Sequence, residues 1–207
     1  MCLVLTIILS YLLGSVPFGL LVTSWVSRVD VREHGSGNTG MTNVLRTSGL
    51  WPALLVLTLD VGKAVLVVTL SKIITSDHVI TVFAAMSVLV GHNWSIFIKF
   101  GGGKGIATGL GALLALSPIA GLIAVMIGIP IIAMTRYVSL GTILGSLSAL
   151  ISMPALYVFA PNIQMSISSP IYILYPVVCL PMIIFKHSEN IRRLIGGRER
   201  KLGDVAN

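Results

Sequence analysis

The chain has 207 residues, of which 55% are hydrophobic and only 10% are charged, and its net charge is +7. Soluble domains carry about 25% charged residues, which excludes a water-soluble fold of this size, and disordered chains are polar and charge-rich, which excludes disorder. With a mean hydropathy of +0.97, the composition predicts an all-α polytopic membrane protein. We expect residues 1–207 to form a single integral membrane domain.

Long stretches without charge mark the expected membrane spans. No charged side chain precedes Arg28, and further gaps run over 78–98, 105–135 and 137–185. A membrane-spanning helix needs about 20 mainly apolar residues, and a helix satisfies its own backbone in lipid. We expect about seven spans, the fourth and fifth short or tilted, and a polar turn around Pro161–Asn162. The spans are residues 2–26, 52–74, 79–96, 105–116, 118–134, 140–159 and 169–185.

The first apolar stretch is predicted to be a retained span and not a secretory signal. Signals begin with positive residues and have apolar regions of about 7–15 residues, whereas Met1-Cys2-Leu3 carries no positive side chain and the run continues to residue 26. Gly14 and Pro17 are expected to kink this span. Cys2 and Cys179 lie in distant apolar runs, so we expect small hydrophobic residues there and neither a disulfide nor a metal site.

Basic residues are distributed unevenly between the two sides that seven spans define. Six of the fourteen Lys and Arg lie in segments 27–51, 97–104 and 135–139, and six more lie in the tail, residues 186–207. The positive-inside rule makes this side cytoplasmic, which leaves the N-terminus outside and places the protein in the cell (inner) membrane. Topology therefore explains the net charge, and no nucleic-acid partner is expected.

A polar segment rich in glycine, asparagine and hydroxyl side chains, residues 30–49, separates the first two expected spans. Glycine lets the backbone approach a ligand closely, successive free N–H groups form an anion-binding concavity, and arginine adds a bidentate phosphate contact. The segment predicts a phosphate site, with a flexible connecting loop as the alternative. Its candidate residues are Gly35, Ser36, Gly37, Asn38, Thr42, Asn43 and Arg46.

The same segment contains a G-x-G-x-x-G pattern that does not predict a dinucleotide site. Gly35, Gly37 and Gly40 form the pattern, and Asp60 follows at a suitable distance. The fingerprint has to follow a buried strand and open a βαβ unit, whereas Asp60 here lies in an apolar span. Asp60 and Lys63 are one helical turn apart, and intramembrane charges mark function by default. Mutual pairing and ligand contact are equal alternatives for them.

A second glycine-rich segment, residues 91–109, resembles a P-loop but fails its pattern, because Gly105 and not Ser or Thr follows Lys104. Its exposed amides, its lysine and the start of a helix still favour an anion. The alternative for the loop is a glycine-rich turn in which Lys104 only sets the membrane topology. The alternative for His92 is a histidine that is hydrogen-bonded at the membrane interface. The candidates are His92, Gly102, Gly103, Lys104, Gly105 and Thr108.

Two further segments lie on the same expected side. The short turn 135–141 holds Arg136 and Ser139. In the tail, His187, Asn190 and Leu194 recur at helical spacing, which predicts a short helix that continues the last span. A basic amphipathic tail that lies on anionic lipid is an equal alternative for this helix.

Taken in order, these motifs resemble the bacterial acyl-phosphate:glycerol-3-phosphate acyltransferases, the PlsY family, from about residue 11 to residue 202. Two departures are Gly101, where the family often has lysine, and Ser95, where proline is usual. Lys99 is a candidate to compensate for the missing charge. The matching residues are Gly14-Ser-Val-Pro-Phe-Gly19, Gly35-Ser-Gly-Asn38, Thr42-Asn43, Arg46, Asp60 with Lys63, Gly91-His92, Gly102 to Thr108, Ser139-Leu-Gly141, and His187 with Glu189-Asn190 through Glu199.

The resemblance implies seven helices, an extracellular N-terminus and an active site at the cytoplasmic face. It implies transfer of a fatty acyl group from acyl phosphate to the 1-hydroxyl of glycerol 3-phosphate, giving lysophosphatidic acid. No cofactor or metal is implied, neither acyl-CoA nor acyl carrier protein is the direct donor, and the expected functional partner is the soluble enzyme that makes acyl phosphate.

From the motifs and the resemblance together we expect two groups of site residues. The catalytic candidates are Ser36, Arg46, Lys104, His187 and Asn190, and the substrate-binding candidates are Gly35, Gly37, Asn38, Thr42, Asn43, His92, Gly102, Gly103, Gly105, Thr108, Arg136 and Ser139. Ser36, the amides of 35–38 and Lys104 are expected near the oxyanion. Arg46 and the loop 102–105 are expected to hold phosphate, and His187 and Asn190 to position glycerol phosphate.

The identity of the base and the class of function each have alternatives. The substrate phosphate is the favoured base, His187 is the second candidate, and a covalent Ser36 acyl-enzyme is the third route. The alternative function is a small organic-anion transporter or channel, with Asp60 and Lys63 in its pathway. Transport predicts midplane polar residues in related halves, whereas here the polar residues cluster on one side.

Overall fold

The computed structural model describes residues 2–160 and 169–204. In this part of the chain every regular element is helical, apart from one isolated bridge between Ser95 and Gly101, which confirms the all-helical prediction. The α-helices are α1 (Cys2–Gly14), α2 (Phe18–Val26), α3 (Met41–Ser48), α4 (Leu50–Thr75), α5 (His78–Asn93), α6 (Ile106–Leu116), α7 (Pro118–Thr135), α8 (Val138–Phe159), α9 (Leu174–Lys186) and α10 (Ser188–Ile195). Three 3₁₀ turns join them, η1 (Val31–Glu33), η2 (Ile96–Ile98) and η3 (Pro170–Ile173).

Four segments are long and apolar enough to cross a membrane: Leu3–Val26, α4, α7 and α8. Pro170–Lys186 and α10 make a fifth if the bent pair is one span. Helices α5 and α6 are shorter, with 16 and 11 residues. At 1.5 Å per residue they rise only about 24 Å and 17 Å, so seven spans remains a prediction. The expected polar turn at Pro161–Asn162 lies outside the described residues.

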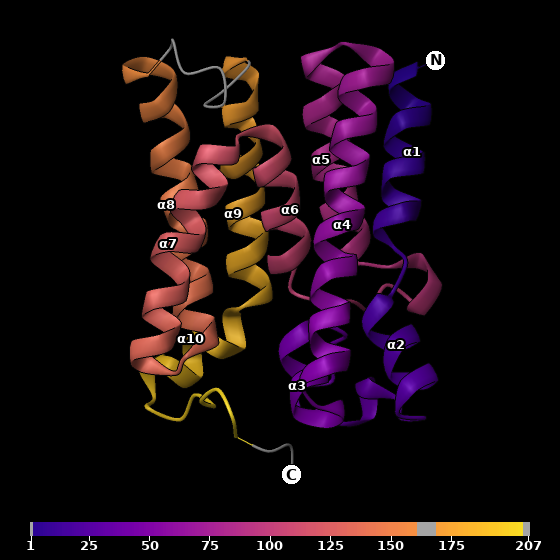
Figure 1. The fold of residues 1–207 in the computed structure, drawn as a ribbon, viewed down its shortest axis with the longest axis vertical. Helices are drawn as coiled ribbons and strands as arrows, with labels where there is room; N and C mark the ends of the chain where they lie inside the picture. The colour runs from indigo at the N-terminus through magenta and orange to yellow at the C-terminus, as the bar shows by residue number, and fades with distance from the viewer. Residues whose placement is uncertain (1, 161–168, 205–207) are drawn as a thin grey trace.

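The long helices run roughly along one axis of the molecule (Figure 1). Helix α4 packs with α1, α5 and α6, while α7, α8 and α9 form the other side of the bundle. The start of α1 lies at one end, and α2, α3 and α10 gather at the other (Figure 1). An odd number of crossings requires such an arrangement.

Three boundaries differ from the sequence-based expectation or refine it. The kink expected at Gly14 and Pro17 is confirmed, because α1 ends at Gly14 and α2 begins at Phe18. The third expected span is too long, because the chain turns after Asn93. The tail helix does not continue the last span straight, because His187 leaves the helical region and α10 bends away by 62°.

Small residues let these helices approach closely, as expected where lipid removes the hydrophobic drive between helices. A Cβ added to Gly111 of α6 would collide with the carbonyl group of Val61 in α4. Gly91 of α5 meets the backbone of α1 at Tyr11 in the same way. These contacts hold α6 against α4 and the last turn of α5 against α1.

Candidate active site

A cavity of about 620 Å³ lies among α3, α6, α7, α8, α9 and the tail. All five residues predicted to be catalytic line it: Ser36, Arg46, Lys104, His187 and Asn190. Seven of the predicted substrate-binding residues also line it: Gly35, Asn38, Thr42, Asn43, His92, Gly105 and Ser139. The structure therefore gathers the separate polar segments around one space.

The loop before α3 is folded around the side chain of Asn43. The Asn43 amide donates to the carbonyl groups of Val31, His34 and Asn38 at 2.9–3.0 Å, and its Oδ1 accepts from the Ser36 N–H at 2.9 Å. These bonds occupy every polar atom of the side chain. Asn43 thus shapes the cavity wall, and it presents the Ser36 region to the interior without a free group of its own.

Arg46, in contrast, offers an uncommitted guanidinium. It is partly buried on α3 and lines the cavity, and within residues 2–160 and 169–204 it makes no hydrogen bond or ion pair. Burial lowers its pKa, as does the neighbouring positive charge of Arg200, but an arginine remains protonated. A free arginine fork matches the geometry of a phosphate.

Lys104 stands at the start of α6, where Gly105 turns the chain with φ of 81°. Its ammonium group donates to Oδ1 of Asn190. Burial and the nearby positive charge of Arg193 lower the pKa of Lys104 to about 8, although Glu199 and Glu189 oppose this shift. The ammonium form of Lys104 therefore predominates below pH 8, and its proton is lost more readily than that of an ordinary lysine.

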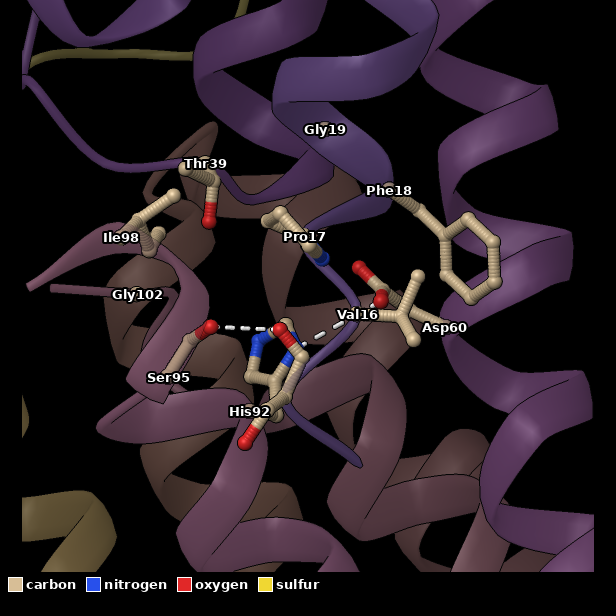
Figure 2. A pocket seen from close by; sticks show the side chains of 11 residues that line it. Val16, Pro17, Phe18, Gly19, Thr39, Asp60, His92, Ser95, Ile98 and Gly102 are labelled. Carbon is tan, nitrogen blue, oxygen red and sulfur yellow. Dashed lines mark hydrogen bonds and ion pairs between the residues drawn. The ribbon is translucent and has the colours of Figure 1, made fainter. Parts of the chain in front are cut away.

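His92 connects the glycine loop to the charged pair in α4. Its Nδ1 lies 3.0 Å from Lys63 Nζ and 3.4 Å from Asp60 Oδ1, and Lys63 and Asp60 are 2.7 Å apart. Figure 2 shows Asp60 and His92 facing each other beside the α1–α2 break. The mutual pairing of Asp60 and Lys63 is thus observed, and Asp60 also reaches the cavity wall.

The loop 101–105 lies directly on this histidine. The Gly103 N–H donates to the His92 carbonyl at 3.1 Å, and a Cβ on Gly103 would collide with the imidazole ring. Gly102 lines a separate small pocket with His92 and Asp60 (Figure 2). His92, Gly102 and Gly103 therefore form a support under Lys104.

Five predicted substrate-binding residues lie outside the cavity wall, because the fold uses them as supports. Thr108 is fully buried in α6, and the Gly37 N–H donates to the His34 carbonyl. Arg136 donates to the Leu202 carbonyl at 2.7 Å and so fixes the tail. The five residues are Gly37, Gly102, Gly103, Thr108 and Arg136.

The two departures from the family pattern also lie outside this wall. The Ser95 N–H donates to the Gly101 carbonyl at 2.8 Å, a bond that proline cannot make. Lys99 is exposed beyond the turn. Ser95 and Gly101 thus shape the 95–101 turn, and Lys99 contributes no charge to the cavity wall.

His187 presents one ring nitrogen to the cavity. Its Nδ1–H donates to the Ile183 carbonyl at 2.8 Å, which leaves the Nε2 lone pair as an acceptor. Burial, with help from the positive charge of Lys104, lowers the pKa of His187 to about 4, against the opposing effects of Ile183 and Glu199. His187 is therefore neutral near pH 7.

Glu199 joins the tail to the rest of the site. Its Oε1 accepts from Ser139 at 2.8 Å and from Asn190 at 2.6 Å, and its Oε2 accepts from Arg193 Nε at 2.8 Å. Burial favours the protonated carboxyl, but these three donors outweigh it and lower the pKa of Glu199. Glu199 had no predicted role of its own, because a single acid between Arg198 and Arg200 resembles ordinary surface charge.

The comparisons with known proteins agree over the whole chain. Residues 4–197 match the family described as "Glycerol-3-phosphate acyltransferase". Relatives with that same description include proteins from Thermoanaerobacter pseudethanolicus (40% identity, 97% of this chain and 96% of the relative) and Desulforamulus reducens (41%, 97% and 95%).

Two crystal structures of PlsY (YgiH), an integral membrane glycerol 3-phosphate acyltransferase, match in fold. They represent its glycerol 3-phosphate form and its lysophosphatidic acid form, with TM-scores of 0.87 and 0.85. Each is 33% identical to this chain, and each match covers 98% of this chain and 96% of the other.

Proposed function

Because the chain belongs to the glycerol-3-phosphate acyltransferase family of integral membrane enzymes, we propose that it takes its acyl group from acyl phosphate. The acceptor is the 1-hydroxyl of glycerol 3-phosphate, and the products are lysophosphatidic acid and phosphate. The observation that carries the proposal is a cavity that has cationic side chains at one end and an apolar lining beyond them. One substrate has a phosphate and an acyl chain, and the other has a phosphate alone.

The polar end suits two phosphate groups. Arg46 and Lys104 come from separate segments and face the same space, and both are partly buried, which strengthens their attraction for an anion. We assign phosphate binding to these two cations and to the amides at the start of α6. We assign the positioning of glycerol 3-phosphate to His187 and Asn190.

In the proposed reaction the 1-hydroxyl oxygen attacks the carbonyl carbon of acyl phosphate. A new C–O ester bond forms, the bond between the acyl carbon and the phosphate oxygen breaks, and phosphate leaves with its electron pair. Negative charge develops on the carbonyl oxygen in between. The Ser36 hydroxyl, the amides of residues 35–38 and the Lys104 ammonium are the donors that we assign to it.

The proposed base is the phosphate of glycerol 3-phosphate. It takes the hydroxyl proton and later passes it to solvent. With a pKa of about 4, His187 is a weak base near pH 7, and its free Nε2 is better suited to accept a hydrogen bond from the 2-hydroxyl, which does not react. A covalent Ser36 intermediate has no activating group, because no histidine or carboxylate hydrogen-bonds the Ser36 hydroxyl among the described residues.

Location and supply follow from the same proposal. We place the cavity at the cytoplasmic face of the cell membrane, because most of the Lys and Arg residues lie in the segments predicted to be cytoplasmic. A soluble enzyme that makes acyl phosphate is then the functional partner. Acyl phosphate is hydrolysed in water, so delivery from the cytoplasmic side is the direct route.

The test is an assay of purified protein in detergent with palmitoyl phosphate and glycerol 3-phosphate. Lysophosphatidic acid should form without acyl-CoA. An Arg46→Ala, Lys104→Ala double variant should lose at least about 100-fold in kcat/KM, the scale of losing charge stabilisation at a developing oxyanion. The matched control replaces two cations outside the cavity wall, Arg192 and Lys99, by alanine and should retain wild-type activity.

Two outcomes contradict the proposal. The first is no product from palmitoyl phosphate together with product from palmitoyl-CoA, which would reassign the donor. The second is equal activity in the double variant and its control, which would remove the cavity from the reaction.

A further inference from the structure

The apolar part of the cavity is closed at its far end. Four helices contribute the last residues of the wall in this direction. They are Leu113 of α6, Ala124 of α7, Ala149 of α8 and Tyr175 of α9. Along its helix, each is the wall residue farthest from the cationic segments. Together the four form one level of the bundle.

One helical turn beyond this level, each of the four segments contributes a side chain with almost no exposed surface. Each of these residues is three or four positions from the wall residue of its segment, in the direction away from the cationic end. They are Leu116 (1% exposed), Ala120 (0%), Met153 (0%) and Tyr172 (0%). All four belong to the main hydrophobic core. We call this layer the floor.

The wall just before the floor is held in place by a bond across the cavity. Tyr175 Oη donates to the Gly109 carbonyl at 3.1 Å and ties α9 to α6. Ser139 at the cationic end and Ala149 at the far end are ten residues apart on α8. At 1.5 Å per residue they are separated by about 15 Å along the helix. The apolar space thus has a definite depth.

We propose that this floor limits the length of the acyl chain, and that Ala149 is the residue that sets the limit. The inference rests on the proposed function, in which the chain of the donor occupies the apolar end. A chain that reaches the floor meets core side chains with almost no exposed surface, and protein interiors deform little. Ala149 has the smallest side chain at that level, together with Ala124, and it faces the place where a chain would end.

The test compares lauroyl, myristoyl, palmitoyl and stearoyl phosphate as donors for wild type and Ala149→Leu. The leucine fills the space at the end of the chain, so the kcat/KM ratio of stearoyl to lauroyl phosphate should fall about tenfold or more, the scale of a clash or lost methylene in an apolar pocket. The KM for glycerol 3-phosphate should not change. The control, Ala155→Leu, lies on the same helix outside the cavity wall and should leave the ratio unchanged.

A second variant acts in the opposite direction and remains informative if Ala149→Leu fails to fold. Met153→Ala removes side-chain volume from the floor, so the stearoyl to lauroyl ratio should rise. Ratios equal to wild type in the folded variants overturn the proposal, because the chain then leaves between helices into lipid. If wild type uses no acyl phosphate of any length, the proposed function itself fails, and the two failures are distinguishable.

Discussion

Individual polar side chains divide into those bound to the fold and those left free for a ligand. Asn43 and Glu199 satisfy their polar atoms on backbone and side-chain partners and hold the loop and the tail. Arg46 and the Nε2 of His187 face the cavity with no partner among the described residues. The free groups are a cation and an acceptor, as a phosphate and a hydroxyl require.

The pH dependence of activity belongs to this scale. We expect kcat/KM to rise as pH increases through about 6, where a phosphate gains its second negative charge, and to fall above pH 8. The alkaline fall follows from Lys104, whose pKa of about 8 means that the ammonium is lost as pH rises. The decline should approach tenfold per pH unit. His187, at about 4, titrates below this window.

The variant Lys104→Arg separates the acid limb of the pH profile, where kcat/KM rises, from the alkaline limb, where it falls. Arginine stays charged at high pH, so the alkaline fall should disappear while the acid limb remains near pH 6. A profile whose alkaline limb is unchanged in Lys104→Arg would assign that limb to another group. An acid limb that shifts in His187→Gln would make His187 the base.

Among the secondary-structure elements, the long apolar helices and the short tail helix α10 were predictable from sequence, whereas α3 was not. The expected spans 52–74, 118–134 and 140–159 match α4, α7 and α8 within two residues at each end, because charge gaps report lipid contact directly. Helix α3 was missed, since its eight residues are mostly polar and it lies within a segment read as a loop. Its stability comes from tertiary contacts, which no single segment encodes.

The candidate site was predictable by residue type but not by role. Glycine, cation and amide residues at membrane boundaries indicated segments that the structure brings around one cavity, and the five catalytic candidates line it. The sequence did not reveal that Gly103 supports His92 or that Arg136 holds the tail. Such roles depend on contacts between residues far apart in sequence.

Helix contact makes a specific prediction at Gly111. In Gly111→Ala the new methyl group collides with the Val61 carbonyl group and pushes α6 from α4. We expect a loss of about 1–3 kcal/mol, as for other overpacked cores, and a lower melting temperature in detergent. Gly62→Ala on α4 meets no atom within 4 Å and is the control. It should be neutral or slightly stabilising, because alanine replaces glycine inside a helix.

Activity should follow stability in this pair. Helix α6 carries Lys104 and Gly105 at its start, so Gly111→Ala should also lower kcat/KM for glycerol 3-phosphate. Equal melting temperatures for the two variants would show that α6 and α4 are not held by this close approach.

For the whole molecule, the distribution of charge predicts its orientation. Ser76 lies in the exposed turn between α4 and α5, and Arg198 lies exposed in the tail. In a Cys2→Ser background, a membrane-impermeant maleimide should label Ser76→Cys in intact cells and leave Arg198→Cys unlabelled. Inverted vesicles should give the reverse pattern. Labelling of Arg198→Cys but not of Ser76→Cys in intact cells would overturn the orientation. Cys179 is too buried to contribute (2% exposed).

The overall course of the cavity also bears on the class of function. The space ends at the floor and does not continue through the described bundle. A transporter requires access from both sides in turn. A closed apolar end instead suits an enzyme whose lipid substrate enters and leaves by the same route.

The shortness of α5 and α6 has a consequence for the surrounding bilayer. In the seven-span prediction both helices cross the membrane, and their rise of about 24 Å and 17 Å falls short of a hydrocarbon thickness of about 30 Å. We therefore expect the loop between them to lie below the lipid headgroups of its leaflet, and the mismatch to be relieved by local thinning of the membrane. We expect water to reach the level where acyl chains begin. A water-soluble phosphate and a lipid tail can then meet at the protein while each stays in its own solvent.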